Sequence, residues 1–477
     1  MAKSGLPTQA EDFPAWYVEV VKRAGMAEHG PAKGSMIIKP YGFAVWERIQ
    51  RALDDRFKAT GHENFYFPLL FPMSLLAKEE EHLEGFIPQV ALVTKGGGQD
   101  LEEPLVIRPT SEAVIWSTYA RWIQSYRDLP LLYNQWCNVL RWEMRTRLFL
   151  RTSEFLWQEG HTAHATRAEA VEEAIRMHGV YREVVEDVLA IPMLAGRKSE
   201  SERFPGADET YTIEGLMRDK KALQGATSHF LGQNFSKAYG VTFLNEKGEQ
   251  DYAWGTSWGF SARMVGGTIM AHGDDKGLRL PPMVAPTQVV LIPIYKSDDE
   301  MGRVVQAASR IHDELTSNGV RARVDDRDQY RPGFKFSEWE LKGVPVRMEI
   351  GPRDVESSQV VIVKRTSGTK ETVPTSEAVA GMADLLGAVQ TELYEDALSF
   401  RTENTHEVES FDQLRDGLRD GGFFVGPWCG NGACEEKVSS ETTATIRVLA
   451  IEAEDPRGPC VVCGEPGTER ATWARAY

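Results

Sequence analysis

The stretch RWEMRTRLFLRTSEFLWQEGH, residues 141–161, decides the fold. Residues 131–144 and 151–162 predict two strands joined by a basic turn at residues 145–150. Alternate side chains of a strand share a face. One face of this pair therefore carries Arg141 and Glu143 from the first strand, and Arg151, Ser153, Phe155, Trp157, Glu159 and His161 from the second. Such a face is too polar for a core and too aromatic for ordinary surface, so it indicates a ligand platform. The alternative is an amphipathic strand whose charges pair with each other.

Three further polar segments have simpler explanations when each is taken alone. Residues 108–112 (Arg-Pro-Thr-Ser-Glu) suit the N-cap of a helix that continues from Ala113. Residues 224–229 suit an ordinary polar turn. In residues 255–267, small residues permit close backbone approach, and Arg263 is predicted to begin a helix.

The composition is that of a large, water-soluble, multidomain protein. The chain has 477 residues, 42% of them apolar, and a formal net charge of −16. It contains no run of eighteen apolar residues, and its first twelve residues carry no apolar leader, so we expect a cytoplasmic protein without membrane segments. The negative charge disfavours indiscriminate coating of nucleic acid, although a local basic patch remains compatible with selective RNA binding.

The pattern along the chain predicts an α+β multidomain protein. A helix over residues 41–62, a strand over 65–71 and a helix behind the capping pair Thr166 and Glu169 suggest an antiparallel sheet covered by helices. The Pro-rich run at residues 280–286 ends this region. Strands and helices then alternate up to a helix over residues 376–398, as in a small α/β domain. We therefore divide the chain into residues 1–282, 283–400 and 401–477.

Four of the five cysteines lie in the last region and form two pairs, Cys429 with Cys434 and Cys460 with Cys463. Glycines flank both pairs and allow the backbone to fold around a metal. Four thiolates are typical of structural Zn²⁺, so we predict a small zinc-binding C-terminal domain. The alternative is four buried thiols in a reducing compartment. The fifth, Cys137, is expected to be a packing residue.

Taken together, the four polar segments resemble the signature motifs of class II aminoacyl-tRNA synthetases, most closely those of the prolyl-tRNA synthetase family. The helix from Tyr41 with residues 65–68 looks like motif 1, which implies a homodimer. Residues 141–155 look like motif 2, and residues 259–263 look like motif 3. The resemblance implies ATP-dependent attachment of L-proline to tRNA(Pro) through a prolyl-adenylate, on an antiparallel catalytic sheet.

The resemblance also implies roles for individual residues. The catalytic pair would be Arg141 and Arg263, with Arg141 bridging the amino-acid carboxylate and the α-phosphate. The ATP site would comprise Arg141, Glu143, Leu150, Arg151, Phe155, Gln224, Thr227, Ser261 and Arg263, together with Mg²⁺. The proline site would comprise Thr110, Glu112, Arg141, Trp157, Glu159, His161 and His229, with Thr110 and Glu112 receiving the imino group.

The interval between motifs 2 and 3 is short, since only 112 positions separate Arg151 from Arg263. This leaves no room for the large editing insertion of bacterial-type enzymes, so the chain resembles the archaeal and eukaryotic-like form. The terminal Tyr477 matches a residue whose carboxylate reaches toward the active site in similar synthetases. A frayed tail is the competing explanation.

Residues 320–370 form a locally basic region, with eleven Lys and Arg against eight Asp and Glu. Its segment 338–347 mixes carboxylates, cations and an aromatic ring suited to unstacked RNA bases. The resemblance makes this the anticodon-binding domain, with Glu340, Lys342 and Arg347 as tRNA contacts. A solvated helix–strand junction is the alternative.

Two other functions remain to be compared with the prolyl enzyme. One is a class II synthetase of the same subgroup for histidine, threonine or glycine. The other is a catalytically inactive RNA-binding paralogue. The presence of Arg141, Phe155 and Arg263 favours an active enzyme, and the proposed proline-site residues favour proline.

Overall fold

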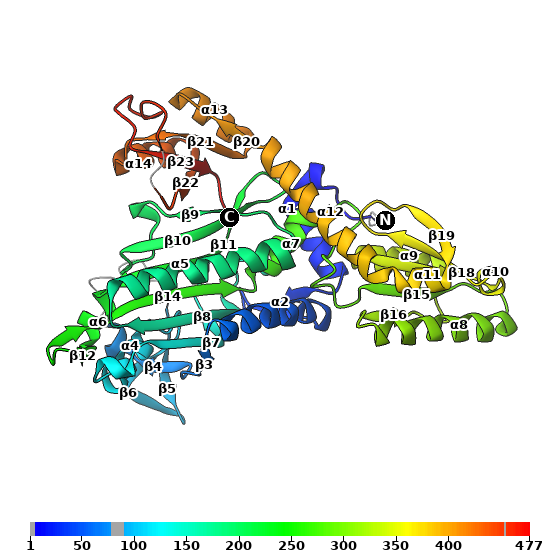
Figure 1. Cartoon of the computed structure of the whole chain (residues 1–477), viewed down its shortest axis with the longest axis horizontal. Coiled ribbons are helices and arrows are strands. Elements are labelled where there is room, and N and C mark those ends of the chain that lie inside the picture. The colour runs from blue at the N-terminus through cyan, green and yellow to red at the C-terminus, as the bar shows by residue number, and fades with distance from the viewer. Residues whose placement is uncertain (1–4, 78–89, 453–454) are drawn as a thin grey trace.

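The computed structural model describes residues 5–77, 90–452 and 455–477. The prediction of no apolar leader rests on the first twelve residues. The first four of them, residues 1–4, lie outside the described residues. No helix in the described ranges has both the length and the apolar content needed to cross a membrane. Figure 1 shows a large sheet region, an α/β unit at one side, and a C-terminal region above the sheet.

The described residues form an eleven-stranded sheet in the order β20-β21-β23-β22-β9-β10-β11-β14-β8-β7-β3. Its central part is antiparallel, as predicted, from β9 through to β7. The strands of this part are β7 (Leu131–Leu140), β8 (Glu154–His164), β9 (Leu194–Arg197), β10 (Glu209–Leu216), β11 (Ala222–Gly232) and β14 (Trp254–Ser261). Strand β3 (Glu63–Asn64) is added at its edge, in parallel with β7.

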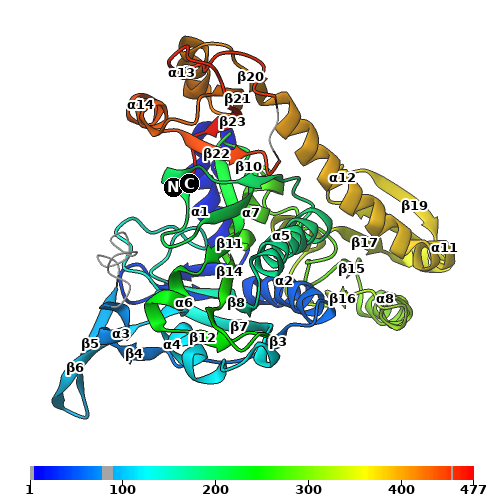
Figure 2. The same cartoon turned by 60° about the vertical axis from the view of Figure 1, so that its left-hand side comes forward.

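Helices α2 (Pro40–Ala59) and α5 (Arg167–Glu183) lie across one face of this sheet, as the two views in Figure 1 and Figure 2 agree. Gln158 and Trp258 point toward them, since the Tyr181 hydroxyl donates to Gln158 at 2.6 Å and Trp258 packs on Phe57. Gly160 is required beneath Trp258, because a Cβ there would lie 2.1 Å from its ring. The predicted capping box of α5 is confirmed. The opposite face of β8 is left free to form a site.

Shorter elements complete this region. They are α1 (Gln9–Arg23), β1 (Ala27–His29), β2 (Met36–Ile38), β4 (Leu70–Pro72), α3 (Met73–Ala77), β5 (Ala91–Gly96), β6 (Gln99–Ile107), α4 (Glu112–Trp122), η2 (Tyr126–Asp128), η3 (Val184–Val188), η4 (Glu200–Glu202), α6 (Asn234–Tyr239), β12 (Thr242–Leu244), β13 (Gln250–Tyr252) and α7 (Arg263–His272). Strands β4, β6 and β5 form a separate small sheet. As predicted, Arg263 begins α7.

The α/β unit contains a five-stranded sheet in the order β16-β15-β17-β18-β19, with parallel and antiparallel pairs. Its elements are β15 (Val289–Pro293), α8 (Asp298–Ser317), β16 (Ala322–Val324), α9 (Pro332–Leu341), β17 (Val346–Ile350), α10 (Pro352–Glu356), β18 (Gln359–Lys364), β19 (Lys370–Pro374), α11 (Thr375–Ala380) and α12 (Met382–Glu403). The single helix predicted over residues 376–398 is wrong, because Gly381 separates α11 from α12. Strand β19 and helix α10 were not predicted.

The C-terminal region extends the central sheet. Its elements are β20 (Thr405–Glu407), α13 (Phe411–Asp420), β21 (Phe423–Trp428), α14 (Gly432–Thr442), β22 (Thr445–Leu449) and β23 (Glu469–Ala474). Leu449 of β22 pairs with Arg197 of β9, so the two regions share one hydrogen-bonded sheet. The chain end is docked rather than frayed, because the Tyr477 N–H donates to the Ala222 carbonyl at 3.1 Å and its hydroxyl donates to Asp219 at 2.6 Å.

Three sequence-based element predictions are corrected. Residues 65–69 are not a strand, since Pro68 lacks an N–H and restricts the residue before it. The connection between β7 and β8 contains four residues that were predicted to lie on strands: Arg141, Glu143, Arg151 and Ser153. The chain turns there because Arg147 and Arg151 form reciprocal backbone hydrogen bonds. Residues 224–229 belong to β11 and are not a turn, because strands on both sides provide ladder partners.

Candidate active site

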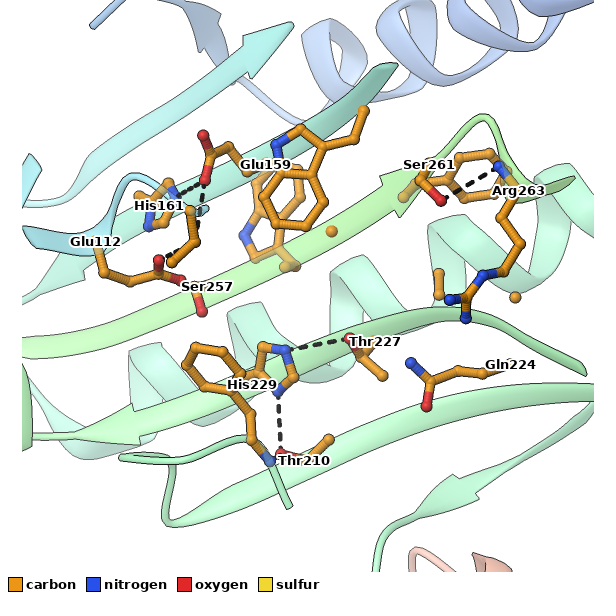
Figure 3. Close-up of a pocket in the computed structure, with 18 of the residues that line it drawn as sticks. Glu112, Glu159, His161, Thr210, Gln224, Thr227, His229, Ser257, Ser261 and Arg263 are labelled. Carbon is orange, nitrogen blue, oxygen red and sulfur yellow. Dashed lines mark hydrogen bonds and ion pairs between the residues drawn. The ribbon is translucent and has the colours of Figure 1, made fainter. Parts of the chain in front are cut away.

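A pocket of about 240 Å³ opens on the face of the sheet opposite α5. Figure 3 shows its two ends: Glu112, Glu159 and His161 lie at one, and Gln224, Ser261 and Arg263 at the other. All seven residues predicted to bind proline line this pocket, as do six of the nine predicted for ATP. The remaining three, Glu143, Leu150 and Arg151, line an adjoining pocket that shares Arg141, Phe155, Ser261 and Arg263 with the first.

Sheet register explains why distant segments meet in this pocket. Glu159 of β8 faces Gln135 of β7 on one side and Gly259 of β14 on the other. Gly259 in turn faces Thr227 of β11. Directly paired residues of a sheet project to the same face, so these four positions form one row across the pocket floor.

Glu159 is the most densely bonded side chain of the amino-acid end. Its carboxylate accepts from the Ser111 hydroxyl at 2.5 Å, from the Ser111 backbone N–H at 3.1 Å and from the Gln135 amide at 2.9 Å. The His161 ring nitrogen Nε2 lies 3.1 Å away. Glu112, also buried, accepts from the Thr110 hydroxyl. Two carboxylates are thus held rigidly side by side, in a place suited to a cationic ligand group.

The charges at this end are set by burial and by these bonds. Burial opposes ionisation of Glu159, but its hydrogen bond and charge interaction with His161, aided by Ser111 and Gln135, hold its pKa well below the ordinary value. Burial also disfavours protonated His161, yet bonding to Glu159 and the charge of Glu112 raise its pKa overall. The pair therefore favours a carboxylate beside an imidazolium.

His229 forms the neighbouring wall. Its ring hydrogen-bonds the hydroxyls of Thr210 at 3.0 Å and Thr227 at 3.1 Å, and it stacks on Phe204 with 4.6 Å between the ring centroids. Burial, with a contribution from the charge of His161, lowers the pKa of His229 to about 3. The ring is therefore neutral at physiological pH and offers an apolar, fixed surface.

Arginines and aromatic rings surround the other end. The Arg141 guanidinium lies 5.2 Å from the Trp157 ring centroid and 5.6 Å from that of Phe155, and its Nε donates to the Pro109 carbonyl at 3.1 Å. The Arg263 Nε donates to the Leu150 carbonyl at 3.2 Å. Burial and the charges of Arg141 and Arg151 lower the pKa of Arg263 to about 10. Converging cations of this kind are suited to a polyanion.

Some polar atoms in the pocket have no hydrogen-bond partner among the described residues. They are the Ser257 hydroxyl, His161 Nδ1 and Trp157 Nε1, all buried. Buried polar atoms are nearly always paired in native proteins, so these mark places for ligand contacts. Ser257 was missed, although alternation along β14 from Ser261 would have found it. Ser111 was also missed, although it lies between the predicted Thr110 and Glu112. Glu202 and Phe204 were missed because only tertiary contacts bring them to the site.

The predicted tRNA contacts lie in the α/β unit. Glu340 of α9 and Arg347 of β17 line a pocket of about 110 Å³, together with Lys364, Arg365 and Lys370. The Arg347 guanidinium lies 4.4 Å from the Phe336 ring centroid. Lys342 is outside this lining and donates to Glu338 at 2.8 Å. The structure thus brings together two of the three predicted residues.

The four C-terminal cysteines form a compact cluster. Their sulfur atoms all lie within 4.8 Å of one another. Gly430 and Gly464, each following a cysteine of the cluster, have φ angles of 79° and 81°, a conformation that a side chain disfavours. The donor set and its proximity fit a tetrathiolate zinc site. The isolated Cys137 instead packs beside Glu159, with 3.4 Å between sulfur and oxygen.

Comparisons with known proteins agree with this geometry. Residues 93–270 match the family described as "tRNA synthetase class II core domain (G, H, P, S and T)". Residues 288–385 match "Anticodon binding domain", and residues 411–477 match "Prolyl-tRNA synthetase, C-terminal".

Full-length relatives decide the assignment. The chain is 53% identical to the proline–tRNA ligase of Rubrobacter xylanophilus, over 99% of this chain and 98% of the relative. It is 50% identical to that of Amoebophilus asiaticus, over 99% of both. The chain belongs to the prolyl-tRNA synthetase family. The predicted family, fold class and enzyme class are thereby confirmed.

Solved structures of the family share the whole fold. The crystal structure of prolyl-tRNA synthetase from Cryptosporidium parvum with halofuginone and AMPPNP has a TM-score of 0.95 and 40% identity, covering 99% of both chains. A second structure of that enzyme, complexed with L-proline and AMP, has a TM-score of 0.93 and 39% identity, covering 99% of this chain and 97% of that one.

Proposed function

We propose that this pocket joins L-proline to ATP as prolyl-adenylate and then transfers the prolyl group to the terminal ribose of tRNA(Pro). The observation that carries the proposal is that one pocket has two carboxylates, Glu112 and Glu159, at one end and two arginines, Arg141 and Arg263, at the other. The first end suits the imino group of the amino acid, and the second suits a triphosphate. Carboxylate attack on the α-phosphate between the two ends releases pyrophosphate.

At the amino-acid end, Thr110 and Glu112 receive the proline imino group. Trp157, Glu159, His161 and His229 wall the ring. An apolar ring offers no polar group to read, so the rigidity of this wall has to supply the discrimination. The hydrogen bonds of Glu159 and His229 are the support for that rigidity.

At the nucleotide end, Arg141 bridges the amino-acid carboxylate and the α-phosphate, where charge develops in the transition state. Phe155 and Arg263 cover the two faces of the adenine, and Glu143 accepts from its amino group. Leu150, Arg151, Gln224, Thr227 and Ser261 complete the nucleotide site. Mg²⁺ accompanies the nucleotide and neutralises phosphate charge when bound. No side chain acts as a nucleophile, and catalysis rests on positioning and charge stabilisation.

Amino-acid-dependent exchange between ATP and pyrophosphate, measured across all twenty amino acids, tests this function without tRNA. Exchange led by proline, with a weaker alanine signal, is expected. Exchange led by histidine, threonine or glycine would overturn the amino-acid assignment. No exchange with any amino acid would favour an inactive RNA-binding paralogue.

The second step requires tRNA(Pro), whose anticodon we assign to the α/β unit. The pocket containing Glu340 and Arg347 combines carboxylates and cations beside Phe336, which suits unstacked loop bases. Lys342, which does not line this pocket, is retained as a proposed tRNA contact. The division into residues 1–282, 283–400 and 401–477 assigns catalysis, anticodon binding and zinc binding to successive regions.

We also propose that the chain is of the archaeal and eukaryotic-like form, without editing in cis. Its support is that residues 167–252 are occupied by α5, β9 to β11, α6, β12 and β13, of which β10 and β11 line the pocket. Slow hydrolysis of alanyl-tRNA(Pro) by the pure protein is expected, and rapid hydrolysis would contradict it. The working compartment is the cytosol, where ATP and tRNA are available.

A homodimer through the motif 1 region completes the proposal. A hollow of about 580 Å³ runs along α2 and is lined by charged residues, including Arg48, Arg51 and Asp54. Tyr66 follows α2 in the sequence and is 70% exposed. An exposed aromatic ring is typical of the apolar part of a protein–protein interface. Sedimentation equilibrium should give twice the chain mass.

The proposal also includes a structural zinc ion. Zn²⁺ held by Cys429, Cys434, Cys460 and Cys463 should be present at about one ion per chain.

A further inference from the structure

A buried cluster of charges joins the C-terminal region to the catalytic sheet. Arg447 of β22 donates to both oxygens of Glu214 on β10, from Nη2 at 2.9 and 3.2 Å and from Nε at 3.3 Å. Lys198, at the end of β9, donates to the same carboxylate at 2.7 Å. Glu214 is fully buried, and Lys198 and Arg447 are 2% and 7% exposed. Two cations from different regions thus share one carboxylate.

Arg447 has a second contact that leads to the pocket. Its Nη1 lies 3.4 Å from Oε2 of Glu202, a residue that lines the candidate active site. Two positions later, Phe204 stacks on His229, the proposed wall of the proline ring, with 27° between the ring planes. We call residues 198–204, which include Glu202 and Phe204, the wall segment. This segment therefore contacts a side chain of the C-terminal region.

A second bond from the C-terminal region holds the same segment. The Ser199 hydroxyl donates to Oε1 of Glu435 at 2.7 Å, and both residues are buried. Glu435 lies on α14, directly after Cys434 of the cysteine cluster. Glu435 fixes the start of the wall segment, and Arg447 fixes its middle.

The backbone around Arg447 is irregular in the way this contact requires. The pairing of β22 with β23 shifts register between Ile446 and Val448, so Arg447 is the extra residue of a bulge. Bulges redirect a side chain out of the regular alternation. The bulge aims Arg447 at Glu214 and Glu202.

Glu214 also faces the nucleotide end. It pairs with Gln224 across β10 and β11, and both belong to the pocket side of the sheet. Burial disfavours the ionised form of Glu214, but Lys198 and Arg447 outweigh this and lower its pKa. Two members of this cluster also act on Arg263: besides burial and the nearer arginines, which lower its pKa, the Glu214 carboxylate raises it and the charge of Arg447 lowers it.

We propose that Arg447 is a positioning residue for the reaction: by holding Glu202 and Glu214 it fixes wall segment 198–204 against His229 and so shapes the amino-acid end of the pocket. This inference rests on the proposed function. It gives the C-terminal region a role in amino-acid binding although its own cysteine cluster lies outside the pocket.

The test compares Arg447→Met with a matched control, Arg470→Met. Both arginine side chains are 9% exposed and lie on neighbouring strands of the C-terminal region, but Arg470 pairs with Glu407, away from the pocket. Proline-dependent exchange at saturating ATP gives KM for proline and kcat, and calorimetry gives the thermal midpoint. We expect Arg447→Met to raise KM for proline by about twofold to thirtyfold, and Arg470→Met to leave it unchanged.

A double-mutant cycle that combines Arg447→Met with Glu202→Ala separates the effect of Arg447 on the position of Glu202 from its effect on the stability of the fold. If Arg447 acts partly through Glu202, the KM increase of the double variant will be smaller than the product of the single increases. Equal thermal shifts for Arg447→Met and Arg470→Met with unchanged KM would overturn the inference.

Two further outcomes are decisive. If Arg447→Met does not fold, Glu202→Ala decides, since an unchanged KM for proline in that variant would equally overturn the inference. If the unmodified protein shows no proline-dependent exchange, both the proposed function and this inference are overturned.

Discussion

Ser111 binds both oxygens of the Glu159 carboxylate, with its hydroxyl 2.5 Å from Oε1 and its backbone N–H 3.1 Å from Oε2. Ser111 is also the residue from which α4 begins, so the carboxylate lies at the positive end of a helix dipole. The start of a helix thereby fixes a side chain of a neighbouring strand. Glu159 is held ionised and in one orientation before any ligand arrives.

Glu159→Gln should raise KM for proline by about tenfold or more, because it replaces a charge-assisted network with neutral bonds and removes the carboxylate to which His161 is bonded. The matched control is Glu154→Gln, an exposed position on the same strand that accepts from Asn138. Exchange kinetics measure both. Equal KM values for the two variants would contradict the role of Glu159.

Arg141→Ala should lower kcat for exchange by about 100-fold to 1000-fold, since it removes the cation placed where charge develops on the α-phosphate. Arg141→Lys should recover only part of the rate, because an ammonium lacks the planar fork that contacts two oxyanions. Circular dichroism checks that both variants are folded. An alanine variant with normal kcat would remove Arg141 from the mechanism.

Local sequence signals predicted the parts of the site that are built by single elements. The capping box at Thr166 and Glu169, the helix start at Arg263 and the alternation of Phe155, Trp157, Glu159 and His161 along β8 are set by neighbours a few residues apart. These interactions are local, so a sequence pattern is sufficient to identify them.

Long-range contacts explain what the sequence did not predict. Residues 224–229 contain turn formers, yet they form a strand because β10 and β14 flank them. Glu202 contacts Arg447, which lies 245 positions later in the sequence. Phe204 stacks on His229, which lies 25 positions later. The fusion of the sheet at Leu449 and Arg197 likewise depends on tertiary packing.

Arg347→Ala should raise KM for tRNA(Pro) in aminoacylation by about tenfold, because it removes a cation from the proposed base pocket beside Phe336. The control is Arg353→Ala, which removes an exposed cation on α10. The ratio of aminoacylation to exchange isolates the tRNA-dependent step. A tRNA KM that changes equally in both variants would indicate a general charge effect instead.

Cys460→Ser should reduce bound zinc from about one ion per chain to near zero and lower the thermal midpoint, because a hydroxyl does not replace a thiolate ligand of Zn²⁺. Cys137→Ser is the control, since this cysteine lies beside Glu159 and away from the cluster. Elemental analysis and calorimetry measure the two effects. Retention of a full complement of zinc in Cys460→Ser would contradict the four-cysteine site.

The buried His272 at the end of α7 should make stability depend on pH. Burial lowers its pKa to about 4, and its Nε2 lies 2.8 Å from the Leu189 carbonyl. The unfolded chain binds the proton near the ordinary value of about 6.5, so acidification below that pH favours unfolding. This one group should remove about 2 kcal/mol of stability between pH 7 and pH 5.

His272→Gln retains a donor for Leu189 but does not titrate, so its urea midpoint should fall less between pH 7 and pH 5 than that of the unmodified protein. Urea unfolding at a series of pH values measures the difference. Identical pH profiles for His272→Gln and the unmodified protein would mean that His272 binds its proton equally well in the folded and unfolded chain.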